Sequence, residues 1–192
     1  MIRPLIFNVL FIAVSVSQSN QWHQKFIDAM IDSNGVSISV SIQQKQFTSS
    51  SVEAAVIEIL KKKHYIMDLP TETIFVLEDT IQTWNKVANQ LIIDQLIEGD
   101  INIFHLLTGD FKDVTFDRTI EGKKDISMNF NVLDMGYSGH IKIKKSGQPI
   151  EIKVIYGKDQ SMLLSVTSYH KGDLKLYDSF NPLNAEVIDL RE

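Results

Sequence analysis

The sequence predicts a mainly antiparallel β fold with a few helices, and three observations support this prediction. Apolar and polar residues alternate with a period of two in about eleven short segments. The connections between these segments are mostly short, which favours antiparallel neighbours. No linker or low-complexity segment divides the 192 residues, so we expect one large sheet.

The N-terminus has the three parts of a secretory signal peptide. Arg3 supplies a positive charge, an apolar run extends from Leu5 to Val16, and small residues follow it. We expect cleavage after Ser17 or Ser19, so that residues 1–19 are a signal peptide and residues 20–192 a single periplasmic domain. An uncleaved anchor is the alternative, although the apolar run is shorter than the ~20 residues that span a bilayer.

Two helices are expected. The first is amphipathic and covers residues 21–33, where Trp22, Phe26 and Met30 follow one another at helical spacing. The second is a short helix in the break of the alternation at residues 98–117, and we expect Gly109 to close it.

The alternation also predicts the individual strands. A sheet of this width is expected to curl. Two helices are too few to cover the apolar face of such a sheet completely. We therefore expect an apolar concavity, which is the usual location of a ligand site. A closed barrel with a filled interior would give the same pattern and stays open as an alternative. The predicted strands cover residues 36–43, 52–61, 64–69, 73–78, 81–86, 90–95, 126–132, 138–144, 150–156, 162–169 and 173–180.

The composition excludes several classes of function. Without cysteine the chain has no disulfide, no thiol nucleophile and no cysteine-ligated metal. The formal charge of −5 and the lack of a basic stripe with aromatic residues argue against nucleic acid as a partner.

Catalytic motifs are missing from the sequence as well. The five histidines are scattered, and we expect His23, on the polar side of the first helix, to be solvated. No metal-binding, nucleotide-binding or serine-hydrolase motif occurs. We therefore expect no enzyme, no cofactor and no metal site. A secreted hydrolase with unrecognised site residues and a purely structural exported domain are the remaining alternatives.

Three stretches share the order and spacing of a known family. They are Val40–Gln46, which contains a Gln-Lys pair, His64–Asp94, with the segment Thr83-Trp84-Asn85, and the hairpin Ile141–Val154. They resemble the LolA family of periplasmic lipoprotein carriers. With the N-terminal signal and the helix-first order, the resemblance covers nearly the whole mature chain.

The resemblance implies an incomplete, half-open antiparallel β-barrel of about eleven strands, covered by the N-terminal amphipathic helix and the short mid-chain helix. Its apolar interior would receive the acyl chains of lipoproteins from an inner-membrane ABC-type transporter. The carrier, a monomer, would pass them to an outer-membrane acceptor. A LolA-like module that senses lipids or lipoproteins is the alternative function.

Methionine and rigid aromatic residues suit flexible acyl chains, although core packing explains the same residues. The residues expected to line the lipid-binding cavity are Trp22, Phe26, Met30, Ile38, Val40, Ile42, Ile57, Ile59, Tyr65, Met67, Leu69, Trp84, Leu91, Ile93, Phe104 and Leu107.

The sequence departs from the family pattern at two places. The family has an Arg-Pro pair after its second strand, whereas Lys61 occupies the nearest position here, without a proline. Lysine keeps the charge but lacks the planar fork of arginine, so we expect Lys61 to contact a lid or a partner differently. A solvated strand end is the other explanation for the run Lys61–Lys63. The end at Glu192 also implies that a longer C-terminal strand and helix of some members are missing.

Overall fold

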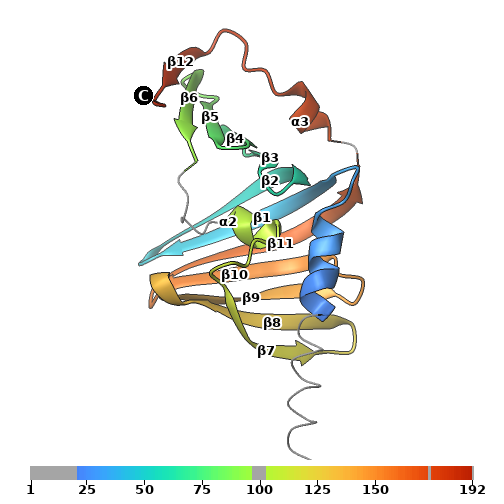
Figure 1. Ribbon diagram of the computed structural model, residues 1–192. Helices are drawn as coiled ribbons and strands as arrows, with labels where there is room; N and C mark the ends of the chain where they lie inside the picture. The colour runs from blue at the N-terminus through green and yellow to red at the C-terminus, as the bar shows by residue number, and fades with distance from the viewer. Residues whose placement is uncertain (1–20, 97–102, 173, 192) are drawn as a thin grey trace, which may run out of the picture.

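A computed structural model of the chain describes residues 21–96, 103–172 and 174–191. These residues form one twelve-stranded sheet that runs from β12 at one edge to β7 at the other and stays open (Figure 1). The predicted class, a half-open and mainly antiparallel β fold with a few helices, is confirmed. The predicted signal peptide lies outside the described residues.

The strands account for most of the described chain. Three helical elements accompany them: a helix at residues 21–30, which we call the N-terminal helix, α2 (Ile103–Leu107) and α3 (Lys175–Ser179), besides a 3-10 turn, η1 (Leu133–Met135). The strands are β1 (Val36–Gln46), β2 (Ser49–Lys61), β3 (His64–Asp68), β4 (Glu72–Leu77), β5 (Thr80–Asn85), β6 (Gln90–Gln95), β7 (Thr115–Glu121), β8 (Asp125–Val132), β9 (Tyr137–Lys144), β10 (Pro149–Gly157), β11 (Gln160–Lys171) and β12 (Glu186–Asp189).

Strand β1 lies between the two halves of the sheet. On one side it pairs with β2, and β3 to β6 follow in chain order. On the other side it pairs with β11 along its whole length, from Val36 opposite Lys171 to Gln46 opposite Gln160, and β10 to β7 follow. These pairs are antiparallel, whereas β12 lies parallel to β6.

The prediction of a strand at residues 173–180 is wrong, because the segment contains α3. Its apolar residues fit both periods: Leu174 and Leu176 are two apart, while Leu174 and Tyr177 have helical spacing. Strands β7 and β12 were not predicted, since both are edge strands with several exposed and charged residues and carry little alternation.

The pairing register divides the side chains between two faces of the sheet. Val36, Ile38, Val40 and Ile42 of β1 define what we call the inner face, and the residues opposite them on the other strands share it. The N-terminal helix and α2 pack on the inner face, where the large apolar cluster of the molecule lies. The outer face carries α3, which contacts β3.

Polar contacts fix the N-terminal helix on the inner face. The Tyr169 hydroxyl donates to the Ala29 carbonyl at 2.5 Å, and the Trp22 Nε1–H donates to Glu121 Oε1 at 2.9 Å. Lys171 pairs with Asp32 at 2.7 Å, just beyond the helix. Contacts to β11 and β7 therefore hold the helix across several strands, as the blue ribbon in Figure 1 shows.

Candidate functional site

Most of the predicted lining residues come together in one apolar cluster. The cluster joins the inner face of the sheet with the N-terminal helix and α2, and each of these residues is at most 8% exposed. Full burial of one such side chain contributes about 1.5–3 kcal/mol. The residues are Trp22, Phe26, Met30, Ile38, Val40, Ile42, Ile57, Ile59, Tyr65, Met67, Leu69, Phe104 and Leu107.

Three predicted lining residues require a correction, because they lie on the outer face. On the inner face Met67 is opposite Ile74, but Trp84 is opposite Thr73, the neighbour of Ile74. Adjacent residues of a strand point to opposite faces, so Trp84 cannot share the side of Met67. Leu91 is opposite Trp84, and Ile93 is two residues further along the same strand.

The mid-chain part of the cover is a single short helix. The Phe104 ring stacks on the Tyr65 ring with centroids 4.3 Å apart, which joins α2 to β3. The Thr108 hydroxyl donates to the Phe104 carbonyl at 2.8 Å, and Gly109 follows with φ +67°, a left-handed conformation that glycine adopts without strain. The prediction that Gly109 ends this helix is confirmed.

The two cover elements touch each other at Gly109. A Cβ atom at this position would lie 2.5 Å from Ile27 Cγ1 of the N-terminal helix. The absence of a side chain at residue 109 thus allows the backbone after α2 to pack directly on Ile27. We call this contact the cover seam.

Aromatic rings extend the contact of the N-terminal helix toward β7. The His23 ring lies 3.8 Å from the Phe116 ring, and Phe111 lies 5.0 Å from Phe116 and 6.2 Å from Phe26, between centroids. The expectation that His23 is solvated is wrong, because its Nε2 atom is buried and has no hydrogen-bond partner within the described part of the chain. Burial lowers the pKa of His23, which favours its neutral form.

The inner cluster provides an uncharged surface. All the members of the cluster in the described ranges are apolar or aromatic, and burial raises the pKa of the Tyr65 hydroxyl to about 12, so this group is neutral at physiological pH. The buried carboxylate Glu58 lies on the outer face, where the Tyr177 backbone N–H donates to it at 2.8 Å. The apolar cluster of the inner face therefore suits an apolar ligand.

The described chain offers neither a metal site nor a membrane-spanning helix. Within residues 21–96, 103–172 and 174–191, no three histidine or acidic residues come together as metal ligands. None of the helices in these ranges combines the length and the apolar character needed to cross a membrane.

A cavity of about 360 Å³ opens at the end of the sheet that carries η1. Tyr137 and Tyr156, whose rings meet edge to face at 4.9 Å, line it together with Met162 and polar residues of β1 and β11. Burial raises the pKa of Tyr156, and the charge of Tyr137 adds to this effect. These tyrosines were not predicted as site residues, because each lies at a strand end next to a turn.

Lys61 lies at the exposed end of β2. Its Nζ is 3.3 Å from Glu78 Oε1, which also receives His64 Nε2 at 2.5 Å, and His64 Nδ1 lies 3.1 Å from the Tyr177 hydroxyl of α3. The hydrogen bonds from His64 and then Lys61 lower the pKa of Glu78. A role for Lys61 in contacting a lid or a partner stays a prediction.

The outer face has a cover that was not predicted from the sequence. The Phe75 ring packs on Tyr177 at 5.2 Å and stacks on Phe180 at 4.8 Å. A sequence signal exists: β3 and β4 contain consecutive apolar residues, Tyr65-Ile66-Met67 and Phe75-Val76, and such runs indicate strands buried on both faces.

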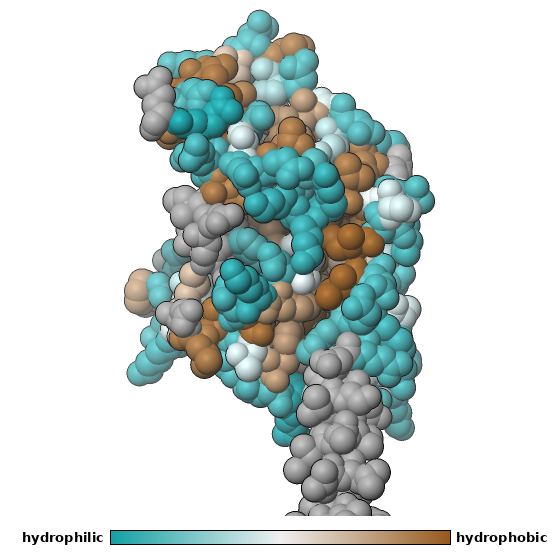
Figure 2. All heavy atoms as spheres, viewed as in Figure 1, coloured by the Kyte–Doolittle hydropathy of each residue, from teal (hydrophilic) through white to brown (hydrophobic). Residues whose placement is uncertain are grey.

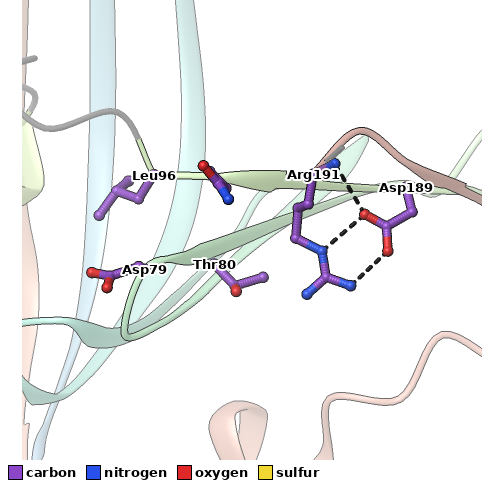
Figure 3. A pocket seen from close by; sticks show the side chains of 6 residues that line it. Asp79, Thr80, Leu96, Asp189 and Arg191 are labelled. Atoms are coloured by element: carbon purple, nitrogen blue, oxygen red, sulfur yellow. Dashed lines mark hydrogen bonds and ion pairs between the residues drawn. The ribbon is translucent and has the colours of Figure 1, made fainter.

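A second cavity, of about 650 Å³, lies at the β12 edge (Figure 3). It is lined mostly by polar residues, among them Asp79, Thr80 and Arg191. The Arg191 guanidinium donates two hydrogen bonds to Asp189, from Nε to Oδ1 at 2.8 Å and from Nη2 to Oδ2 at 2.5 Å. The charged groups that line this cavity have ion-pair partners, since Asp79 also pairs with Lys63. A cavity with this polar lining does not suit an acyl chain.

This ion pair yields a testable prediction for Asp189. The hydrogen bonds from Arg191 lower the pKa of the Asp189 carboxyl group from 3.8 to about 2. Because the folded-state pKa is depressed, the pair contributes stability above pH 3.8 and loses it as the pH falls through 2. Carboxyl NMR titration of the wild type should give a midpoint near 2, and Arg191→Gln should return it toward 3.8. An unchanged midpoint in the variant would contradict the assigned cause.

Comparison with known proteins supports the fold. No family model and no curated protein matches the sequence. The structure resembles that of an uncharacterized conserved protein from Thermus thermophilus, with a TM-score of 0.58 and 11% identity, over 89% of this chain and 99% of that one.

Two other solved structures have lower scores. A LolA superfamily protein from Nitrosomonas europaea has a TM-score of 0.44 and 11% identity, over 83% of this chain and 96% of that one. The Mycobacterium tuberculosis lipoprotein LppX has a TM-score of 0.45 and 10% identity, over 82% of this chain and 97% of that one.

Proposed function

We propose that this protein is a periplasmic carrier that binds the acyl chains of lipoproteins on its inner face and moves them from the inner to the outer membrane. The observation that carries the proposal is an apolar cluster on the inner face of an open sheet, covered by only two short helices. The sequence resemblance to LolA carriers supports the same function. A carrier of this kind binds and releases, so no catalytic group or cofactor is involved.

The physical need for such a carrier follows from the cargo. Each methylene group withdrawn from water contributes ~0.8 kcal/mol, so several acyl chains cannot cross the periplasm exposed. An apolar face with a displaceable cover withdraws them from water. Figure 2 shows apolar residues reaching the surface between hydrophilic ones on the side that carries the N-terminal helix.

Acyl chains would take the place of cover side chains on the sheet. Phe26, Met30 and Phe104 now occupy the inner face. When the cover moves away, the chains contact the sheet residues of the same cluster, such as Ile57 and Met67. Because the cover competes with the cargo for one surface, binding is reversible, and release needs only that the acceptor binds the chains better.

The partners follow from this cycle. An inner-membrane ABC-type transporter would load the carrier and supply the energy, since the sequence carries no nucleotide motif. An outer-membrane acceptor would receive the cargo, and the exposed Lys61 at the end of β2 is a candidate contact for either. Export depends on residues 1–19 acting as a signal peptide.

Loading of a triacylated lipopeptide tests the proposal directly. We expect the mature protein to release lipoproteins from spheroplasts and to retain the lipopeptide in native mass spectrometry. Met67→Gln places an amide on the inner face and should weaken retention roughly tenfold, the equivalent of about 1.4 kcal/mol. The matched control is Trp84→Gln on the outer face, which should load like the wild type.

Circular dichroism and urea unfolding of both variants check that each of them folds. Equal loss of loading in the two variants would show that the inner face is not the binding surface. Failure of the wild-type protein to load or release any acylated cargo would contradict the carrier function itself.

A further inference from the structure

Two neighbouring hairpin turns give this acidic chain a basic corner. The β7–β8 turn carries Lys123 and Lys124, while Lys144 ends β9 and Lys145 follows it in the β9–β10 turn. All four are exposed, and the turns are adjacent because Asp125 of β8 is paired in register with Lys144 of β9. We call these four lysines the basic corner. They contrast with the formal charge of −5 of the whole chain.

The four lysines of the basic corner form no ion pair with the acidic residues beside them, Glu121 and Asp125. Asp125 pairs with Lys142 at 3.5 Å, and Glu121 accepts the hydrogen bond from Trp22. Lys144 reaches a neutral group, Gln148 Oε1, at 3.2 Å. Between residues 21 and 191, as far as they are described, none of the four lysines has an ion-pair partner.

The N-terminal helix begins at this corner. Trp22 is bonded to Glu121, two residues before Lys123. Three residues further on, the Lys25 carbonyl lies against Gly147 in the β9–β10 turn, so closely that a Cβ atom there would be 2.1 Å from it. Gln21 therefore joins the fold next to the basic corner.

We propose that the basic corner is a docking surface for a bilayer that contains anionic phospholipids. The charge is complementary to lipid phosphates, and lysines near a charged membrane surface attract it within a Debye length of ~10 Å. The N-terminal helix begins beside these lysines. Docking would orient the chain with the N-terminal helix next to the lipid surface.

Vesicle binding without acylated cargo tests this proposal independently of carrier function. The mature chain, which contains every described element, is sedimented with vesicles of phosphatidylglycerol and phosphatidylethanolamine and with vesicles of phosphatidylcholine. We expect binding to the anionic vesicles only, weakened by salt, and reduced at least roughly tenfold by replacing all four corner lysines with glutamine.

The control replaces four exposed lysines elsewhere, Lys45, Lys62, Lys112 and Lys158, with glutamine and so changes the net charge equally. Binding of this control should equal that of the wild type. Equal weakening in both variants would show that only the net charge matters and would overturn the proposal. The wild type would not bind anionic vesicles if the basic corner instead bound an acidic protein, and that result would also overturn the proposal.

Discussion

Oxidation of a variant carrying Ile27→Cys and Gly109→Cys is expected to abolish loading of acyl chains, with a loss of at least roughly tenfold. The cover seam joins the N-terminal helix to the backbone that follows α2. In the proposed carrier, acyl chains reach the sheet only when these two elements separate. An ideal Cβ atom at residue 109 lies 3.5 Å from Ile27 Cβ, within the ~3.5–4.5 Å that a disulfide requires. The sequence contains no cysteine, so one disulfide forms.

Reduction provides the internal control for this experiment. Loading should return when a thiol reagent opens the disulfide in the same sample. Since φ at residue 109 is +67°, any side chain costs about 1–2 kcal/mol there. Gly109→Cys alone measures this strain together with the overlap of the added Cβ atom with Ile27 Cγ1. Full loading by the oxidised double variant would show that cargo does not enter through the cover seam.

Replacement of Gly139 by alanine should destabilise the fold by about 1–3 kcal/mol or more. Gly139 lies in β9, where an added Cβ atom would be 1.9 Å from the Lys153 backbone oxygen and 2.8 Å from Phe130 Cζ. A backbone atom of the neighbouring strand cannot yield without distorting the β9–β10 ladder, so the cost exceeds that of a flexible side chain moving aside.

The matched control for this substitution is Gly157→Ala at the end of β10. A Cβ atom at residue 157 would find its nearest neighbour, Gln160 Oε1, at an ordinary 3.6 Å. Urea unfolding should therefore give a lower midpoint for Gly139→Ala and a wild-type midpoint for Gly157→Ala. Similar midpoints for the two variants would contradict the close approach of β9 and β10.

The local sequence patterns predicted most strands, because apolar and polar residues alternate along a strand that is buried on one face only. The alternation of Val36, Ile38, Val40 and Ile42 appears in the structure as the inner face of β1. Trp84 was assigned to the wrong face because it was chosen as a rigid aromatic residue, whereas the pairing register decides on which face a side chain lies. The pairing of β1 with β11 lay beyond prediction, since no local pattern specifies a partner more than a hundred residues away.

The helical cover was predicted in part for the same physical reason. Trp22, Phe26 and Met30 form an apolar stripe long enough to indicate a helix, and α2 was placed by a break in alternation. In α3 five residues are too few to distinguish a helical from an extended pattern. Its position depends on Phe75, Tyr177 and Phe180, whose contacts are made only in the folded chain.

The place of β1 in the middle of the sheet has a consequence for folding kinetics. Its hairpin with β2 forms locally, but its other edge is completed only by β11, which ends at Lys171 near the end of the chain. Until then the backbone N–H and C=O groups on one edge of β1 have no partner strand. Closing such a large loop makes folding slow, so the nascent chain is expected to stay unfolded until β11 has been synthesised.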